Sequence, residues 1–218
     1  MPDPGDTQRV RFGEWTLRVR RAAAESARLM LLIHGWTGDE NSMWVFARSL
    51  PLGYWVIAPR APHAAQPSGY SWRVASLDRQ GGPGLDDLRP SAEALMALVQ
   101  DYSAAEGLPV QRIDVMGFSQ GAALAAALAL LFPDRIRRAA MLSGFVPRGA
   151  EPLLSQSILD GKPFFVAHGS KDQTVDIEHA RQSVRFLQSA GARVTFCEDE
   201  VGHKVGSNCM RGLLGFFA

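Results

Sequence analysis

The chain has 218 residues and a formal net charge of +1; 46% of its residues are hydrophobic and 21% are charged. These values are typical of one globular domain, here residues 1–218, that buries roughly 70% of the surface exposed by its unfolded form. Without a dense Lys/Arg cluster, the near-neutral charge argues against nucleic acid or an anionic membrane as a partner. We therefore expect a small-molecule substrate and a monomer or homodimer.

The N-terminal residues and the hydropathy predict a cytoplasmic protein. The start "MPDPGDTQRV" has no basic segment followed by an apolar one, as a secretory signal would. No apolar stretch approaches the roughly 18 residues of a membrane span, so integral membrane association is not expected. Cys197 and Cys209 are too few for a disulfide scaffold and lack the paired spacing of a zinc site, so we interpret both as free thiols. A bridge between the two is the alternative, which depends on their distance in the fold.

The predicted elements start with an alternating stretch at 10–21, typical of antiparallel edge strands, within residues 1–27. Apolar runs typical of strands buried on both faces follow at 29–34, 54–59, 112–118, 138–145 and 162–169. Segments with helical spacing lie at 41–50, 91–107, 121–132 and 178–191, and a last helix is expected at the C-terminus. The alternation predicts an α/β fold with a mostly parallel sheet, helices on both faces and a minimal cap.

Residues 61–89 form the irregular part of this pattern. The stretch is rich in glycine and proline and has little periodicity. Long irregular loops in compact domains are often functional, so we expect this loop to lie near the active site and to contact substrate.

Ser119 is the candidate nucleophile. It lies in Gly117-Phe118-Ser119-Gln120-Gly121, a G-x-S-x-G pattern with a strand-like run before it and a helix-like run after it. Small neighbours let the serine oxygen project from a strained turn, and the helix N-terminus favours developing negative charge. In isolation the pattern is weak, because a serine here can simply cap a helix.

A serine nucleophile needs a base and an orienting carboxylate, in the chain order Ser, Asp, His for this strand–turn–helix context. Asp172 and His203 each follow a strand-like run and fit this order. Asp199 or Glu200 is the alternative acid. The other histidines have more ordinary explanations, as turn, loop, core and surface residues respectively: His34, His63, His168 and His179.

The oxyanion formed during attack needs fixed donors. We expect the backbone N–H of Gln120 to be one and that of Trp36, in "HGWTGDEN", to be the other. Trp36, Tyr70 and Trp72 are candidate substrate contacts, although aromatic residues near glycine loops, Trp44 included, more often pack in the core. Nucleotide-binding and metal-binding motifs are absent from the sequence, so we expect no cofactor and no metal.

Six motifs in order, "LLIHGWTGDENSMW", "APRAP", "GYSW", "VMGFSQGAALA", "AHGSKDQTV" and "GHKV", resemble the phospholipase/carboxylesterase family of small α/β-hydrolases, which includes the acyl-protein thioesterases. The resemblance covers about residues 28–216 and implies Ser119 as nucleophile, Asp172 as acid, His203 as base, and the Trp36 and Gln120 N–H groups as the oxyanion hole. Trp36 stands where many relatives have a smaller aliphatic residue, and "LDRQGGPGLDD" replaces a region that helps form an acyl tunnel in eukaryotic thioesterases.

These departures favour small esters. The sequence therefore predicts a serine carboxylesterase for short to medium acyl chains that works through an acyl-enzyme intermediate. The alternatives are an acyl thioesterase or lysophospholipase with the same residues, and a ligand-binding member of the fold without catalysis.

Overall fold

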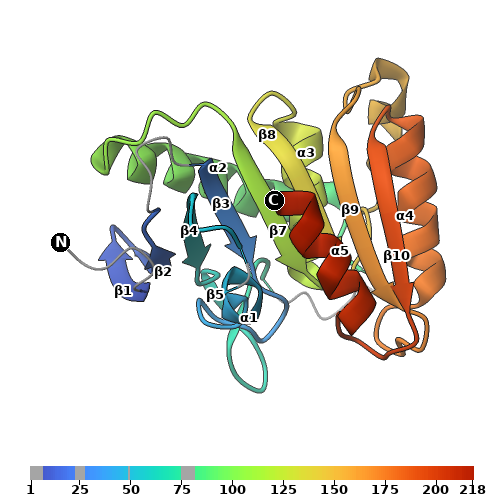
Figure 1. The fold of residues 1–218 in the computed structure, drawn as a ribbon, viewed down its shortest axis with the longest axis horizontal. Coiled ribbons are helices and arrows are strands. Elements are labelled where there is room, and N and C mark those ends of the chain that lie inside the picture. The colour runs from blue at the N-terminus through green and yellow to red at the C-terminus, as the bar shows by residue number, and fades with distance from the viewer. Residues whose placement is uncertain (1–6, 23–27, 49, 75–81) are drawn as a thin grey trace.

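The computed structural model describes residues 7–22, 28–48, 50–74 and 82–218. Its main sheet has eight strands: β1 (Thr7–Phe12), β2 (Trp15–Arg20), β3 (Arg28–Ile33), β4 (Tyr54–Pro59), β7 (Ile113–Phe118), β8 (Ile136–Leu142), β9 (Pro163–Gly169) and β10 (Arg193–Asp199), in the spatial order β1-β2-β4-β3-β7-β8-β9-β10 (Figure 1). β1 pairs antiparallel with β2, and β2 pairs antiparallel with β4. All other neighbours are parallel, so their carboxyl ends share one edge of the sheet.

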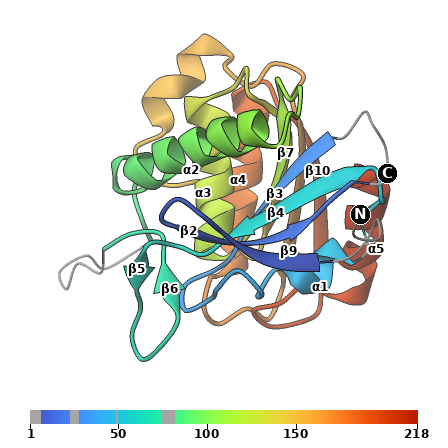
Figure 2. The same ribbon diagram turned by 90° about the vertical axis from the view of Figure 1, so that its left-hand side faces the viewer.

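Helices cover both faces of this sheet. Figure 2 shows α2 (Leu85–Ala105), α3 (Gln120–Leu131) and α4 (Ile177–Ser189) on one side, with α1 (Trp44–Ala47) and α5 (Ser207–Phe217) on the other. Each face has its own buried apolar cluster, since alternate strand residues point to opposite faces. The predicted α/β fold is thus confirmed. Among the described helices, none is both long and apolar enough to cross a bilayer.

α3 is buried along nearly its whole length because it lies against the sheet at the centre of the molecule. Its residues 121–130 are all buried, and most are alanine. Small side chains allow the helix backbone to approach β7 and β8 closely. The start of this helix is thereby fixed relative to the edge where the parallel strands end.

The irregular segment 61–89 differs in part from its prediction. It contains a two-stranded hairpin of β5 (His63–Ala64) and β6 (Tyr70–Ser71), and its last five residues belong to α2. The expected helix at 91–107 therefore begins six residues earlier, where Asp87 Oδ2 accepts a hydrogen bond from the Gly84 N–H. Pro90 lies inside α2. Residues 75–81 lie outside the described part.

Two shorter elements complete the chain. The predicted helix at 41–50 is only the four-residue α1, because the residues before it form turns. A 3₁₀ helix, η1 (Glu151–Gln156), follows the loop after β8. Neither change affects the order of the parallel strands, on which the predicted site depends.

Candidate active site

Ser119 lies on a sharp turn between β7 and α3. Its backbone has φ 54° and ψ −116°, a positive-φ conformation that non-glycine residues rarely adopt. The neighbouring glycines are required by close approach: a Cβ on Gly117 would lie 1.9 Å from the Gly121 carbonyl oxygen, and one on Gly121 would lie 2.1 Å from that of Ile33. The G-x-S-x-G pattern thus allows the turn that exposes the serine.

Ser119, His203 and Asp172 form a continuous chain of polar contacts. The Oγ of Ser119 lies 3.0 Å from Nε2 of His203, and Nδ1 of His203 lies 2.6 Å from Oδ2 of Asp172. The three residues follow β7, β10 and β9, whose carboxyl ends meet at the same edge of the sheet. The structure therefore brings together the three side chains that the sequence predicts for nucleophilic chemistry.

Asp172 is held by the tight turn that follows it. Its Oδ1 accepts hydrogen bonds from the N–H groups of Thr174 at 2.8 Å and Val175 at 3.0 Å, which leaves Oδ2 for His203. Burial alone raises the pKa of this carboxyl, but the hydrogen bonds from Val175, His203 and Thr174 outweigh it and place the pKa below its ordinary value. Asp172 is therefore a carboxylate at neutral pH.

The alternative acids have other partners. Asp199 accepts hydrogen bonds from the side chain of Asn208 at 2.8 Å and from the N–H of Cys209 at 2.9 Å, at the start of α5. Glu200 pairs with Lys171 at the surface, at 2.8 Å. Of the three carboxyl groups weighed from the sequence, Asp172 is the one in contact with His203.

Among the described residues, no other histidine is hydrogen-bonded to the Ser119 oxygen. His34 is buried beside the turn after β3, His63 is in the β5–β6 hairpin, and His168 is a core residue of β9. His179 is an exposed residue of α4 whose ring is 6.2 Å from that of Phe145.

The backbone N–H groups of Trp36 and Gln120, which the sequence predicts as oxyanion donors, both belong to residues beside Ser119. Gln120 directly follows Ser119 at the start of α3, and Trp36 lies in the loop after β3 that packs against Phe118 and Ser119 through Gly35. Within the described residues, neither N–H donates a hydrogen bond to a protein acceptor. Both are therefore available to a ligand.

The loop between β3 and α1, residues 34–43, is anchored from two directions. The Thr37 N–H donates to the Tyr70 carbonyl and the Tyr70 N–H donates to the Gly38 carbonyl, both at 3.0 Å. Behind it, the indole N–H of Trp72 donates to the His34 carbonyl at 2.8 Å, and the Trp72 side chain is only 1% exposed. Trp72 and Tyr70, predicted to contact substrate, act here as supports for this loop.

His34 is part of the same anchoring. Its Nδ1 lies 2.7 Å from the Gly35 carbonyl, and its Nε2 accepts a hydrogen bond from the Ala61 N–H at 3.0 Å. Burial lowers the pKa of this histidine, so the neutral ring, which this pattern requires, is favoured. The structural role expected for His34 fits these contacts.

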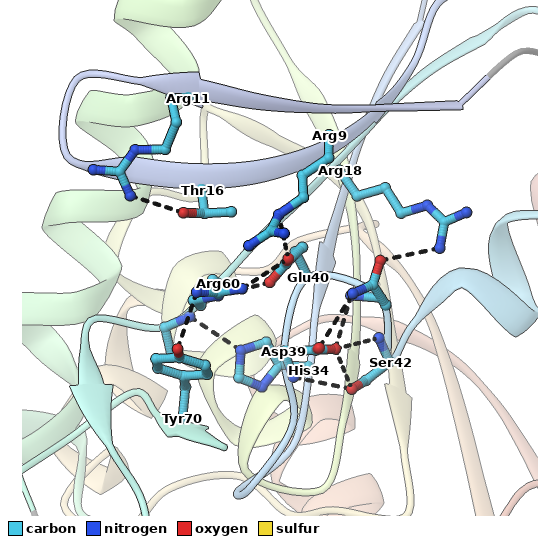
Figure 3. A network of polar contacts seen from close by, with 12 residues as sticks. Arg9, Arg11, Thr16, Arg18, His34, Asp39, Glu40, Ser42, Arg60 and Tyr70 are labelled. Carbon is cyan, nitrogen blue, oxygen red and sulfur yellow. Dashed lines mark hydrogen bonds and ion pairs between the residues drawn. The ribbon is translucent and has the colours of Figure 1, made fainter. Parts of the chain in front are cut away.

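A charged network extends from this loop to the edge strands (Figure 3). Glu40, 1% exposed, binds the Arg60 guanidinium through both carboxylate oxygens, at 2.7 and 2.9 Å, and its Oε1 lies 3.0 Å from Nε of Arg9. Arg60 also donates to the Tyr70 hydroxyl at 2.9 Å. Sequence reasoning missed this network, because an acidic residue in a polar turn normally faces solvent.

Two cavities open at Ser119. The first, about 850 Å³, extends over α4 and is lined by residues such as Arg73, Phe145, Arg148, Val175 and Phe186. The second, about 630 Å³, is lined by His203 and by apolar residues that include Met43, Phe46, Phe118 and Met210. Trp36 lines both and is 56% exposed, in keeping with the predicted substrate contact. Tyr70 and Trp72 line neither, and Trp44 is buried in the core.

The two cysteines differ from the prediction. Cys197 of β10 and Cys209 of α5 form a disulfide with a Cα–Cα distance of 5.5 Å, so they are not free thiols. The bridge joins the two elements on either side of His203. With Asp199 they make the one group among the described residues that has metal-binding composition, but both sulfurs are used in the bridge.

Comparisons with known proteins agree with this architecture. The model of the phospholipase/carboxylesterase family matches residues 16–218. A probable carboxylesterase of Oryza sativa subsp. japonica is 30% identical over 84% of this chain and 74% of its own, and an acyl-protein thioesterase 1 of Debaryomyces hansenii is 26% identical over 80% and 82%.

The carboxylesterase from Mesorhizobium loti has a similar structure, with a TM-score of 0.80, 22% identity and coverage of 96% of this chain and 97% of its own. The Bacillus cereus carboxylesterase is similar at a TM-score of 0.80, 20% identity and coverage of 94% of each chain. The resemblance inferred from the sequence is confirmed: the chain belongs to the phospholipase/carboxylesterase family of α/β-hydrolases and is a serine hydrolase of carboxylic esters.

Proposed function

We propose that Ser119, His203 and Asp172 hydrolyse carboxylic esters with short to medium acyl chains through an acyl-enzyme. The observation that carries this proposal is the contact chain from Ser119 Oγ to His203 Nε2 at 3.0 Å and from His203 Nδ1 to Asp172 at 2.6 Å. The free N–H groups of Trp36 and Gln120 support it.

In the first half-reaction, Ser119 Oγ bonds to the ester carbonyl carbon while His203 takes the hydroxyl proton. The carbonyl oxygen becomes negative and is held by the N–H groups of Trp36 and Gln120, each worth on the order of 3 kcal/mol in such sites. When the intermediate collapses, the C–O bond to the alcohol breaks and His203 gives its proton to the departing oxygen.

In the second half-reaction, water adds to the acyl carbon and His203 accepts its proton. Collapse of this intermediate releases the carboxylic acid and returns the proton to Ser119. Asp172 stays ionised throughout and holds the imidazole in the tautomer whose Nε2 faces the serine.

The direct test is initial rates on p-nitrophenyl esters from acetate to palmitate, for the wild type and Ser119→Ala. Ser170→Ala is a matched control, because Ser170 is exposed in the loop before Asp172. We expect a maximum at short or medium chains, loss of activity in Ser119→Ala, and wild-type rates in Ser170→Ala. Equal rates in wild type and Ser119→Ala refute the assignment of the nucleophile.

The same residues can attack an acyl thioester or a lysophospholipid, because the chemistry acts on any accessible acyl carbonyl. Rates on an ester, a thioester and a lysophospholipid of matched chain length separate these functions. A ligand-binding protein without catalysis would form no covalent adduct with an organophosphonate.

We also propose a small-molecule ester as the partner, a monomeric or homodimeric assembly, and a cytoplasmic location. Disulfides are rare in the cytosol, so this location requires Cys197 and Cys209 to be reduced in the cell. Thiol alkylation in a freshly lysed extract tests the location, and light scattering across concentrations tests the assembly.

A further inference from the structure

His168 of β9 is a buried histidine with one unpaired nitrogen. Its side chain has no solvent exposure, and its Nδ1 has no hydrogen-bond partner among the described residues. An unpaired polar atom in a core lowers stability, whereas a leucine would fill this position without one. The position of the other nitrogen offers a reason for the imidazole.

That nitrogen, Nε2, contacts the turn that holds Asp172. It lies 2.8 Å from the Val175 carbonyl oxygen, and a carbonyl can only accept, so Nε2 carries the proton. The N–H of the same Val175 donates to Oδ1 of Asp172 at 3.0 Å. By binding the Val175 carbonyl, His168 therefore holds the residue whose N–H binds the Asp172 carboxylate.

The same Nε2 also faces the second oxygen of Asp172. It lies 3.4 Å from Oδ2, the atom that lies 2.6 Å from His203 Nδ1. The N–H of His168 points to Val175, so this approach is an electrostatic contact with the positive edge of the ring. Because the ring is buried and bonded to Val175, it limits the positions that Oδ2 can occupy.

We propose that His168 is a positioning residue that fixes the orientation of Asp172, and hence of His203, from behind. This inference rests on the proposed function. It assigns His168 no contact with substrate and no proton transfer, since Asp172 and the 172–175 turn separate it from Ser119. Its effect is on the rate of the chemical step.

The test uses three variants of His168 that differ in whether, and from which position, the side chain can donate a hydrogen bond. His168→Gln places an amide N–H near the position of Nε2, His168→Asn places it near Nδ1, and His168→Leu has no donor. We expect kcat on p-nitrophenyl butyrate to fall about tenfold in His168→Leu and His168→Asn, the rate equivalent of one lost hydrogen bond, with KM changed less than about twofold. His168→Gln should stay within about threefold of wild type.

A purely structural role predicts a different pattern, in which kcat follows the unfolding midpoint of each variant. The inference is overturned if His168→Leu keeps wild-type kcat, or if the Gln and Asn variants lose kcat equally. If His168→Leu does not fold, the comparison of Gln with Asn decides. Ser119→Ala is assayed in parallel. If Ser119→Ala keeps its activity, the proposed function is refuted. If Ser119→Ala is inactive and His168→Leu has the wild-type rate, only this inference is refuted.

Discussion

Glu40→Gln tests whether the buried charge network holds the β3–α1 loop. Glu40 is almost fully buried and receives two hydrogen bonds from Arg60, at 2.7 and 2.9 Å, and an ion pair from Arg9 at 3.0 Å. Glutamine has the same shape but keeps one acceptor oxygen, and its amide group would face a guanidinium donor. The substitution therefore removes the charge and part of the pairing without leaving a void.

The expected cost follows from the burial of the partners. Removing one member of a fully buried ion pair costs about 3–5 kcal/mol. The Arg60 side chain is 23% exposed and that of Arg9 is 63% exposed, so water can replace part of the lost interaction. We expect the free energy of unfolding to fall by about 2 kcal/mol at neutral pH.

The pH dependence of this loss has a definite sign. Burial raises the pKa of Glu40, but the hydrogen bonds from Arg60 outweigh it, and the pKa in the folded state lies below the ordinary value of 4.5. A lowered pKa stabilises the fold above the unfolded-state value, and this contribution is lost as pH falls through the folded-state value. The difference between wild type and Glu40→Gln should be complete near pH 7 and shrink below about pH 4.5.

Urea unfolding at about pH 7 and about pH 4, with kcat on p-nitrophenyl butyrate, measures these effects. We expect kcat to fall about tenfold, because a looser loop no longer fixes the Trp36 N–H. Glu106→Gln is the matched control: its ion pair with Arg21 is partly exposed and should contribute less than about 1 kcal/mol. Equal stability of Glu40→Gln and the control, or a loss that grows in acid, refutes the reasoning.

Three further predictions concern the site and its surroundings. Trp36 lines both cavities, so Trp36→Ala should join them and shift activity toward p-nitrophenyl esters with longer chains. Stability should change little, because the Trp36 side chain is 56% exposed. An unchanged chain-length profile would show that Trp36 does not limit the pocket. Cys209→Ser opens a disulfide between residues 12 apart, and a loop of that size corresponds to about 3 kcal/mol of unfolding free energy. Urea unfolding of both proteins with and without reductant measures this difference. A wild-type unfolding free energy that does not change with reductant contradicts the prediction. Asp172→Asn should lower kcat at least about 10³-fold, because the amide can hold the unproductive tautomer of His203; retention of kcat would remove Asp172 from the mechanism.

The order of elements explains how much of the site could be predicted from the sequence. Ser119, Asp172 and His203 each follow a parallel strand, so their meeting at one edge follows from the fold class alone. The disulfide could not be predicted, because Cys197 and Cys209 come together only through the packing of α5 on β10. The start of α2 was missed because glycine and proline before residue 91 obscure the helical pattern.

Supporting residues were harder to predict than reacting ones. Trp72 lies in a glycine-rich stretch that favours exposure, yet its indole is buried and bonded to the His34 carbonyl. Glu40 is a charge in a polar turn, and its burial becomes apparent only when Arg60 of the distant β4–β5 connection reaches it. Such contacts depend on three-dimensional packing, which residue type and local spacing do not encode.

The two proposed oxyanion donors are mechanically linked through Gln120. Its backbone N–H has no acceptor within the described part of the chain, while its side-chain oxygen accepts a hydrogen bond from the backbone N–H of Trp72 at 3.0 Å. Trp72 in turn holds the His34 carbonyl at the base of the loop that carries Trp36. Displacement of one donor is therefore resisted by the element that carries the other, which is the preorganisation that oxyanion stabilisation needs. The Trp36 side chain is outside this linkage and largely exposed. The rate of the reaction should accordingly depend on the fixed backbone N–H groups of Trp36 and Gln120. Substrate selection should depend on the Trp36 side chain, which can be replaced without disturbing those groups.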